Sequence, residues 1–198
     1  MAEHCISMSG KEFLEKIMNG ERDFSGIHLP LSTNLTLEET YQEVNTLLEK
    51  MPRKELNRNP LILKGVDFEG IIAQKFFLVH ANLSHARLVE ADLKHANLAR
   101  ANLLEANLHL SDLSYTNLSR VDFYLADLSH AKLSYANINK ANFTHSDLYK
   151  SDFRKTLNLD KAHNLEFAVF NKTLVTLKER EIIEETMKKR IYFNELES

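Results

Sequence analysis

A five-residue period runs through the middle of this chain and constrains its fold more than any other feature. Residues 96–108 read ANLARANLLEANL, so Ala-Asn-Leu recurs at every fifth position. Five matches neither the 3.6-residue period of an α-helix nor the two-residue period of a β-strand. Such a period predicts a repeat architecture. A large apolar residue, called here the centre of each unit, occupies fifteen successive positions without a slip: Leu83, Leu88, Leu93, Leu98, Leu103, Leu108, Leu113, Leu118, Phe123, Leu128, Leu133, Ile138, Phe143, Leu148 and Phe153.

Each centre is preceded by a small and then a polar residue. The small residue is mostly Ala, and the polar residue is Asn or Asp in thirteen of the fifteen units, with Arg87 and Lys132 as the exceptions. Small, polar, large is the in–out–in alternation of a short strand fragment, and the next two residues must turn the chain. Asn and Asp side chains bond readily to nearby backbone in turns. We therefore expect a solenoid with centres and small residues inside and Asn and Asp outside.

The period alone leaves the number of sides open. Three sides would stack residues about 15 apart, and four sides would stack residues about 20 apart. An offset of 20 places Lys132 between Asp112 and Asp152 and aligns Phe123 with Phe143. These pairings favour four sides.

The stretch ANLSHARLVEADLKHANLARANLLEANL at 81–108 resembles the A-(D/N)-L-x-x signature of the pentapeptide repeat family. The resemblance covers about half of the chain. It implies an all-β solenoid, a right-handed quadrilateral (four-sided) parallel β-helix with about four pentapeptides per coil. Many members of the family are scaffolds or have no assigned activity, and a quinolone-resistance group mimics duplex DNA and binds type II topoisomerase.

The flanks of the array add α-helices, so the sequence divides into segments of different kinds. The expected segments are a capping helix with a first coil fragment in 1–35, an inserted helix and connector in 36–60, the repeat β-helix in 61–155, an irregular last partial coil in 156–175, and a C-terminal helix in 176–198. The open ends of a solenoid expose unpaired strand groups and core. We therefore expect the first and last helices to cover the two ends.

Sequence signals place the individual helices. Ser9 and Glu12 are spaced as a capping box for a helix that Gly20 would stop. Thr36 would cap the inserted helix, expected over 37–51, and residues 52–60 read as a polar connector. The last helix carries an apolar face that could seal the solenoid or pair two copies in a homodimer: Ile183, Met187 and Ile191.

Composition adds few constraints. The net charge is −3, and the single cysteine, Cys5, excludes an internal disulfide and favours a reducing compartment. The first residues lack a basic region followed by an apolar run, and no apolar stretch approaches the length of a membrane span. We expect a soluble, cytoplasmic protein.

No constellation of residues points to catalysis. A metal site needs several ligands close together, and no two of the nine histidines are separated by the offset that would stack them on a four-sided solenoid. The outward Asp residues lie on convex sides without a cleft that would shift their pKa values. Neither a nucleophile with a base partner nor a Gly-rich phosphate loop occurs. The sequence therefore predicts no catalytic residue, no metal and no cofactor.

Two candidate interaction surfaces follow from the four-sided stacking. The first, called the basic column, consists of His80, Arg100, Arg120 and Lys140. The second, called the aromatic column, consists of His95, Tyr115 and Tyr135. Outward aromatic residues on a rigid rod are a plausible protein-binding stripe, although Tyr and Arg can equally serve only to cover the surface and keep the protein soluble.

These observations favour a non-catalytic scaffold that binds an unidentified partner protein through its faces. The alternative is a DNA mimic that binds DNA gyrase or another type II topoisomerase. Residues 81–155 hold eight acidic and nine basic residues, and the basic column would interrupt a mimic of phosphate charge. Direct binding of nucleic acid is not expected either, because no basic run alternates with aromatics.

Overall fold

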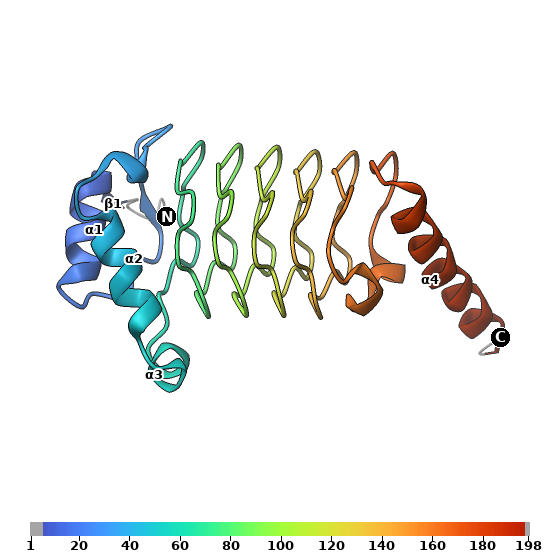
Figure 1. The fold of residues 1–198 in the computed structure, drawn as a ribbon. Coiled ribbons are helices and arrows are strands. Elements are labelled where there is room, and N and C mark those ends of the chain that lie inside the picture. Colours follow the sequence, from blue (N-terminus) through green and yellow to red (C-terminus); the bar gives the residue numbers. More distant parts are fainter. Residues whose placement is uncertain (1–5, 197–198) are drawn as a thin grey trace, which may run out of the picture.

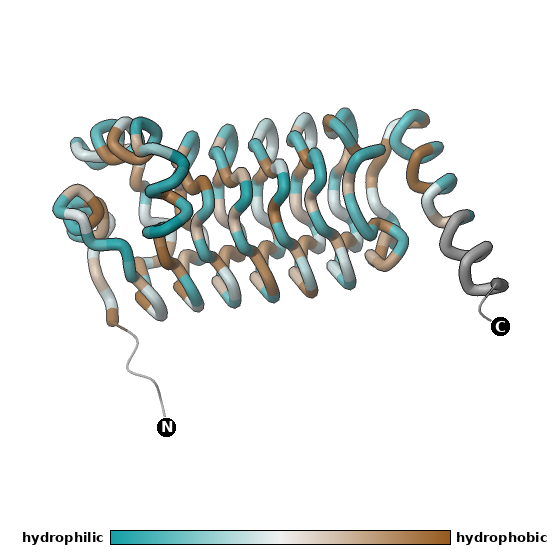
Figure 2. The backbone as a smooth tube through the Cα atoms, turned by 90° about the horizontal axis from the view of Figure 1, so that it is seen from below, coloured by the Kyte–Doolittle hydropathy of each residue, from teal (hydrophilic) through white to brown (hydrophobic). Residues whose placement is uncertain are grey.

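The computed structural model describes residues 6–196, with side chains placed as far as residue 188. The repeats wind into a solenoid, with helices gathered at one end and helix α4 at the other (Figure 1 and Figure 2). Parallel bridges join residues 20 apart from Ile62↔Asn82 to Lys132↔Asp152. One such offset holds four pentapeptides, so the four-sided stacking is confirmed and the three-sided alternative is wrong. Cys5 lies outside the described residues.

The turn between units has the same geometry throughout the array. In the unit centred on Leu98, the Ala101 N–H donates to the Leu98 carbonyl across 2.9 Å, and Arg100 has a φ of 62°. A positive φ at the second central residue is the requirement of a type II β-turn. The Asn97 side-chain oxygen accepts the Ala99 N–H at 3.3 Å. The predicted support of turns by outward Asn and Asp is therefore confirmed.

The interior is a continuous stack of centres and small residues. Leu98 and Ala96 are fully buried, and the rings of Phe123 and Phe143 stack with their centroids 5.2 Å apart. Each buried Leu or Phe contributes about 1.5–3 kcal/mol. Ser146, at a small position, donates its hydroxyl to the Phe143 carbonyl at 2.9 Å, so this buried polar group is satisfied.

The first coil is built from the segment before the inserted helices. Strands β1 (Ile6–Ser7) and β2 (Ile27–His28) pair in parallel, and residues of 22–35 form bridges to the next coil, as Asp23↔Ile62 does. Helix α1 (Gly10–Met18) covers this end with its buried face. The Ser9 hydroxyl accepts the Glu12 N–H at 3.1 Å, as the capping signal predicted.

The inserted segment differs from the prediction. Asn34 organises a 3₁₀ turn, η1 (Leu35–Leu37), by accepting the Thr36 N–H at 3.0 Å, so Thr36 does not cap the following helix. Helix α2 (Tyr41–Lys50) starts later along the chain than expected, and Leu37 is 79% exposed. The predicted polar connector contains helix α3 (Arg53–Arg58), which is anchored by the buried Leu56.

The last coil is complete rather than partial. Its bridges to the previous coil begin as Asn137↔Leu157 and end as Asp152↔Leu174, so this coil is longer than the regular ones. The extra residues sit at Asn158 and Asn164, whose φ values are 62° and 58° and which begin the 3₁₀ turns η2 (Leu159–Lys161) and η3 (Leu165–Phe167). Asn adopts this left-handed conformation more readily than most residues.

Helix α4 (Leu177–Leu196) follows the last coil and contacts η2 and η3. Thr176 donates its backbone N–H to the buried Glu179 carboxylate at 2.8 Å, so this N–H group just before the helix has a hydrogen-bond partner. Ile182 and Ile183 pack against the solenoid core. Among the helices of residues 6–196, none combines the length and apolarity that crossing a membrane requires.

Candidate interaction surfaces

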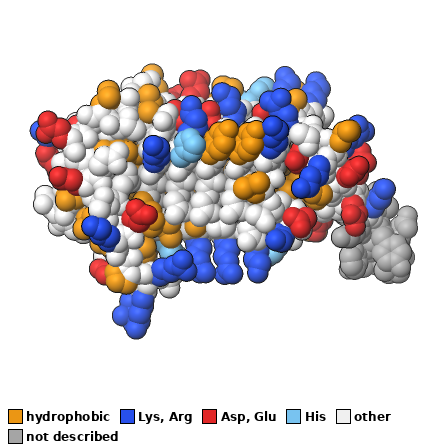
Figure 3. Space-filling view, in the orientation of Figure 1, with side chains coloured by type: hydrophobic (Ala, Val, Ile, Leu, Met, Phe, Trp, Pro, Cys, Tyr) orange, Lys and Arg blue, Asp and Glu red, His pale blue; other side chains and the backbone are white. Residues whose placement is uncertain are grey.

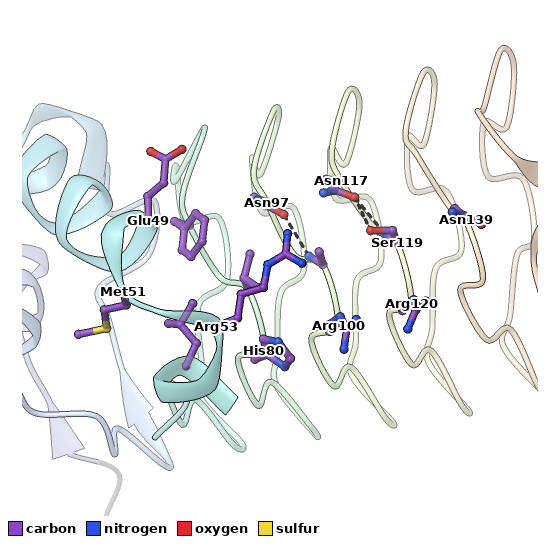
Figure 4. Close-up of a pocket in the computed structure, with 14 residues that line it drawn as sticks. Glu49, Met51, Arg53, His80, Asn97, Arg100, Asn117, Ser119, Arg120 and Asn139 are labelled. Atoms are coloured by element: carbon purple, nitrogen blue, oxygen red, sulfur yellow. Dashed lines mark hydrogen bonds between the residues drawn. The ribbon is translucent and has the colours of Figure 1, made fainter. Parts of the chain in front are cut away.

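A groove of about 400 Å³ lies where helix α3 stands beside one side of the coils (Figure 4). The end of α2 and helix α3 supply one wall through Glu49, Met51, Arg53 and Leu56. The coils supply the other side. Figure 4 shows Arg53 extending from the start of α3 over the coils. The wall exists because Leu56 is buried and holds α3 against the solenoid.

The basic column forms the edge of this groove. His80, Arg100 and Arg120 line it from successive coils, and Lys140 follows on the next coil outside the lining. Each of the four occupies the turn position with a positive φ, between 59° and 63°. Figure 3 shows Lys and Arg side chains in a row along one edge of the solenoid, beside α3. The structure therefore places the predicted column in register and adds Arg53 to it.

The arginines of the groove lack an acidic partner. Some bases elsewhere pair with carboxylates of a neighbouring coil, as Arg87 does with Asp67 at 3.2 Å and Lys132 with Asp112 at 3.6 Å, whereas others, such as Lys64 and Lys75, form no ion pair within the described residues. Within the described part of the chain, Arg53, Arg100 and Arg120 form no ion pair. The groove therefore carries positive charge that the described residues do not neutralise.

The electrostatics of His80 reflect this surplus of positive charge. Burial, followed by the charges of Arg100 and Arg53, holds the pKa of His80 below its ordinary value. A neutral imidazole is favoured where guanidinium groups are close and no carboxylate offsets them. Burial is therefore the main cause of the lowered pKa of His80, and the positive charge of the groove adds to it.

The polar floor of the groove presents mainly hydrogen-bond donors. The side-chain oxygens of Asn97 and Asn117 accept the N–H groups of Ala99 and Ser119, which turns each amide nitrogen toward other partners. The Asn139 side-chain oxygen is buried and finds no hydrogen-bond partner among the described residues. Of the described residues that line the groove, Glu49 is the single acidic one.

The aromatic column is a stack of parallel rings. His95 and Tyr115 have centroids 5.0 Å apart and planes at 18°, and Tyr115 and Tyr135 have centroids 4.8 Å apart and planes at 4°. Lys155, one coil further, donates from its ammonium group to the Tyr135 hydroxyl at 2.8 Å and lies 5.2 Å from the ring centroid. The exposed fractions of Tyr115 and Tyr135 are 51% and 37%.

The sequence missed two members of these surfaces. Lys155 follows Tyr135 at the stacking offset, so the register itself could have identified it. Arg53 was beyond sequence reasoning, because nothing in a short polar helix shows against which side of the solenoid it packs.

The candidate face of the C-terminal helix is only partly described. Ile183 packs against the core of the same chain, and Met187 is half-buried. The side chain of Ile191 lies outside the described residues. Of this face, Ile183 therefore contacts the end of the solenoid.

The histidines of the described chain come together in pairs at most. The rings of His109 and His130 meet edge to face with centroids 5.4 Å apart, and His109 shares a hydrogen bond with the Ser129 hydroxyl at 2.7 Å. The separation of His109 and His130 along the chain is one residue longer than the 20-residue offset of the stacked coils. A search of the sequence for histidines at that offset therefore does not find this pair. Among residues 6–188, no group of three His, Cys, Asp or Glu residues is placed to hold a metal ion.

Comparison with known proteins identifies the repeats. A family model described as pentapeptide repeats matches eight copies over residues 62–98, 91–129 and 122–157. None of the curated proteins compared matches the chain.

Solved structures that match the chain include the following three proteins. HetL is involved in heterocyst differentiation regulation in the cyanobacterium Nostoc, and its sequence is 22% identical to this chain with a TM-score of 0.42. The match covers 57% of this chain and 52% of HetL, so it spans about half of HetL. A pentapeptide repeat protein of the Arabidopsis thaliana thylakoid lumen is 27% identical with a TM-score of 0.41, over 47% of this chain and 68% of that protein. QnrB1, a plasmid-mediated fluoroquinolone resistance protein, is 14% identical with a TM-score of 0.43, over 84% of this chain and 81% of QnrB1.

Proposed function

The chain belongs to the pentapeptide repeat family, and from that premise we propose that it is a non-catalytic scaffold. It binds a partner protein through the outer faces of a rigid solenoid, which we take to be the right-handed quadrilateral β-helix of the family. In a repeat solenoid each coil contacts only its neighbours, and long regular surfaces result. Such surfaces suit recognition of another macromolecule better than they suit chemistry in a closed site.

The aromatic column carries this proposal. Tyr115 and Tyr135 are half-exposed, yet their rings are fixed parallel to each other at 4.8 Å and 4°. Tyrosine is enriched among the residues that dominate binding energy, and a ring that is already ordered loses little side-chain entropy when a partner covers it. The column therefore offers an ordered apolar strip to a partner.

The carboxylates support a non-catalytic role. Burial tends to raise the pKa of Asp112, but hydrogen bonds from Ser114 and the charges of Lys94 and Lys132 outweigh it and lower the pKa. A general acid at neutral pH needs a raised pKa. The outward Asp of this unit supports a turn and an ion-pair network instead.

The proposal is tested by affinity capture with purified variants from extracts of the native host. Tyr115→Ala with Tyr135→Ala removes the aromatic column, and Leu110→Ala with Leu125→Ala is the matched control. The control leucines are 45% and 46% exposed and occupy the same turn position with positive φ. We expect the wild type and the control to retain the same protein and the tyrosine variant to lose at least about 90% of it. Equal capture by all three proteins would contradict the proposal.

The charge distribution counts against the alternative of a DNA mimic. A duplex presents negative charge along its whole length, whereas one edge of this solenoid carries Arg100, Arg120 and Lys140 in a row, all exposed. We therefore expect no inhibition of DNA gyrase supercoiling and no protection of gyrase from a quinolone. Inhibition by the wild type would favour the alternative instead.

A further inference from the structure

The side chains that line the groove beside α3 carry more positive than negative charge. Three arginines, Arg53, Arg100 and Arg120, surround it, and none of them forms an ion pair within the described chain. The one lining acid, Glu49, lies at the α2 end. Elsewhere on the solenoid, Arg87 and Lys94 each reach a carboxylate of an adjacent coil. The groove thus has the charge of an anion-binding site.

We propose that the groove binds an acidic, extended segment of a partner protein that carries an apolar residue at one end. The inference rests on the proposed function, because it assigns a chemical class to the partner of the same scaffold. Guanidinium groups bind carboxylates through paired, charge-assisted hydrogen bonds. The amide nitrogens of Asn97 and Asn117 add donors between the arginines on the groove floor.

The dimensions of the groove fit an extended peptide. Successive coils are spaced by about 4.8 Å, as neighbouring strands are, so Arg100 and Arg120 originate from adjacent levels of the solenoid. Alternate side chains of an extended peptide are about 6.7 Å apart on one face. Long arginine side chains cover this difference, so Arg100 and Arg120 can each reach an acidic residue at alternate positions of such a peptide, and Arg53 approaches it from the α3 wall.

The apolar end of the groove distinguishes a peptide from a nucleic acid. Phe77 and Val79, both half-buried, contribute apolar side chains to the lining on the coil nearest α3. An aliphatic side chain of a peptide can cover them, but a sugar–phosphate backbone has no comparable group. Helix α3 also stands beside the basic column and would obstruct a rigid duplex, which needs a broad basic surface.

The test uses a labelled peptide and fluorescence anisotropy at low salt. The peptide begins with leucine and continues with alternating serine and glutamate, with three glutamates in all. Arg100→Glu with Arg120→Glu reverses the groove charge, and Lys150→Glu with Lys178→Glu applies the same charge change to exposed residues outside the lining. We expect the first variant to bind at least about tenfold more weakly and the second to change by less than about twofold. Circular dichroism and thermal melting verify that both variants fold.

Changes in the peptide separate the two parts of the proposal. Replacement of the glutamates by glutamine should abolish binding, and replacement of the leucine by serine should weaken it about tenfold, as expected for a buried aliphatic side chain. Rising salt should weaken binding throughout. An oligothymidine or a short DNA duplex should displace the peptide less effectively than unlabelled peptide does.

The inference is overturned if the peptide binds the wild type and the Arg100→Glu, Arg120→Glu variant equally, or not at all. It is overturned in favour of a nucleic acid if either oligonucleotide displaces the peptide better than the peptide itself. These failures leave the proposed function intact as long as the aromatic-column variant loses its captured partner. If the aromatic-column variant captures as much partner as the wild type while the peptide binds as expected, the aromatic column is rejected as the binding surface and the groove is retained.

Discussion

The side chain of Asn45 on α2 accepts a hydrogen bond from the backbone N–H of Phe77 across 2.8 Å. In later coils the N–H at this position donates to the carbonyl of the previous coil, as Asn97 does to Phe76 at 2.9 Å. The first coil has no fourth unit to provide that carbonyl, because the chain leaves the solenoid to form α2. Asn45 therefore takes the place of a missing strand fragment, and the inserted helix completes the first coil.

Asn45→Ala should lower the free energy of unfolding by about 1–2 kcal/mol, because the Phe77 N–H then lacks its partner. Asn45→Asp keeps an acceptor and should lose less. Chemical denaturation followed by circular dichroism measures the difference. Asn57→Ala, at an exposed position of α3, is the control and should change stability by less than about 0.5 kcal/mol. Equal values for Asn45→Ala and Asn57→Ala would show that Asn45 does not complete the coil.

The turn support by outward Asn and Asp can be tested at Asn107, whose side-chain oxygen accepts the His109 N–H at 3.0 Å. Asn107→Ala should cost about 0.5–1.5 kcal/mol, the usual net contribution of one hydrogen bond. Asn107→Asp retains the acceptor and should be nearly neutral. Urea denaturation of the three proteins provides the measurement, and an Asp variant as unstable as the Ala variant would refute the assignment.

The array was predictable because its information is local and repeated. Lys132 and its two aspartates, one coil before and one coil after, indicated the stacking offset, and both columns follow from that offset. The departures from the prediction arise where one residue changes the path of the chain. Insertions at Asn158 and Asn164 interrupt the five-residue period, so the sequence did not show that the last coil is complete. Helix α3 is held through its single apolar residue, Leu56, and one residue produces no periodic pattern. The groove depends on that helix, so the sequence alone showed only one of its edges.

Each unit has a turn position with positive φ, and in most units a residue other than glycine occupies it. In the unit that ends at Gly65 this position is a glycine, with a φ of 63°. A Cβ added there would meet no heavy atom within 4 Å, so a substitution tests the backbone conformation alone. Gly65→Ala should destabilise the protein by about 1 kcal/mol. Gly65→Asn should cost less, because Asn tolerates the left-handed region. Thermal unfolding by calorimetry compares the variants, and an alanine variant as stable as the wild type would contradict the expectation.

His80 should titrate below its ordinary value because burial and the charges of Arg100 and Arg53 lower its pKa. The neutral imidazole is then the favoured form in the folded protein. Its contribution to stability is present above the unfolded pKa of about 6.5 and is lost as the pH falls through the folded pKa. Arg100→Gln removes one of the two neighbouring charges and should raise the pKa of His80. NMR titration of the ring signals, with His80→Gln for assignment, measures it. Arg154→Gln, which removes a base paired with Asp152, is the control. If both arginine variants shift the pKa of His80 equally, the potential of the groove does not come from Arg100.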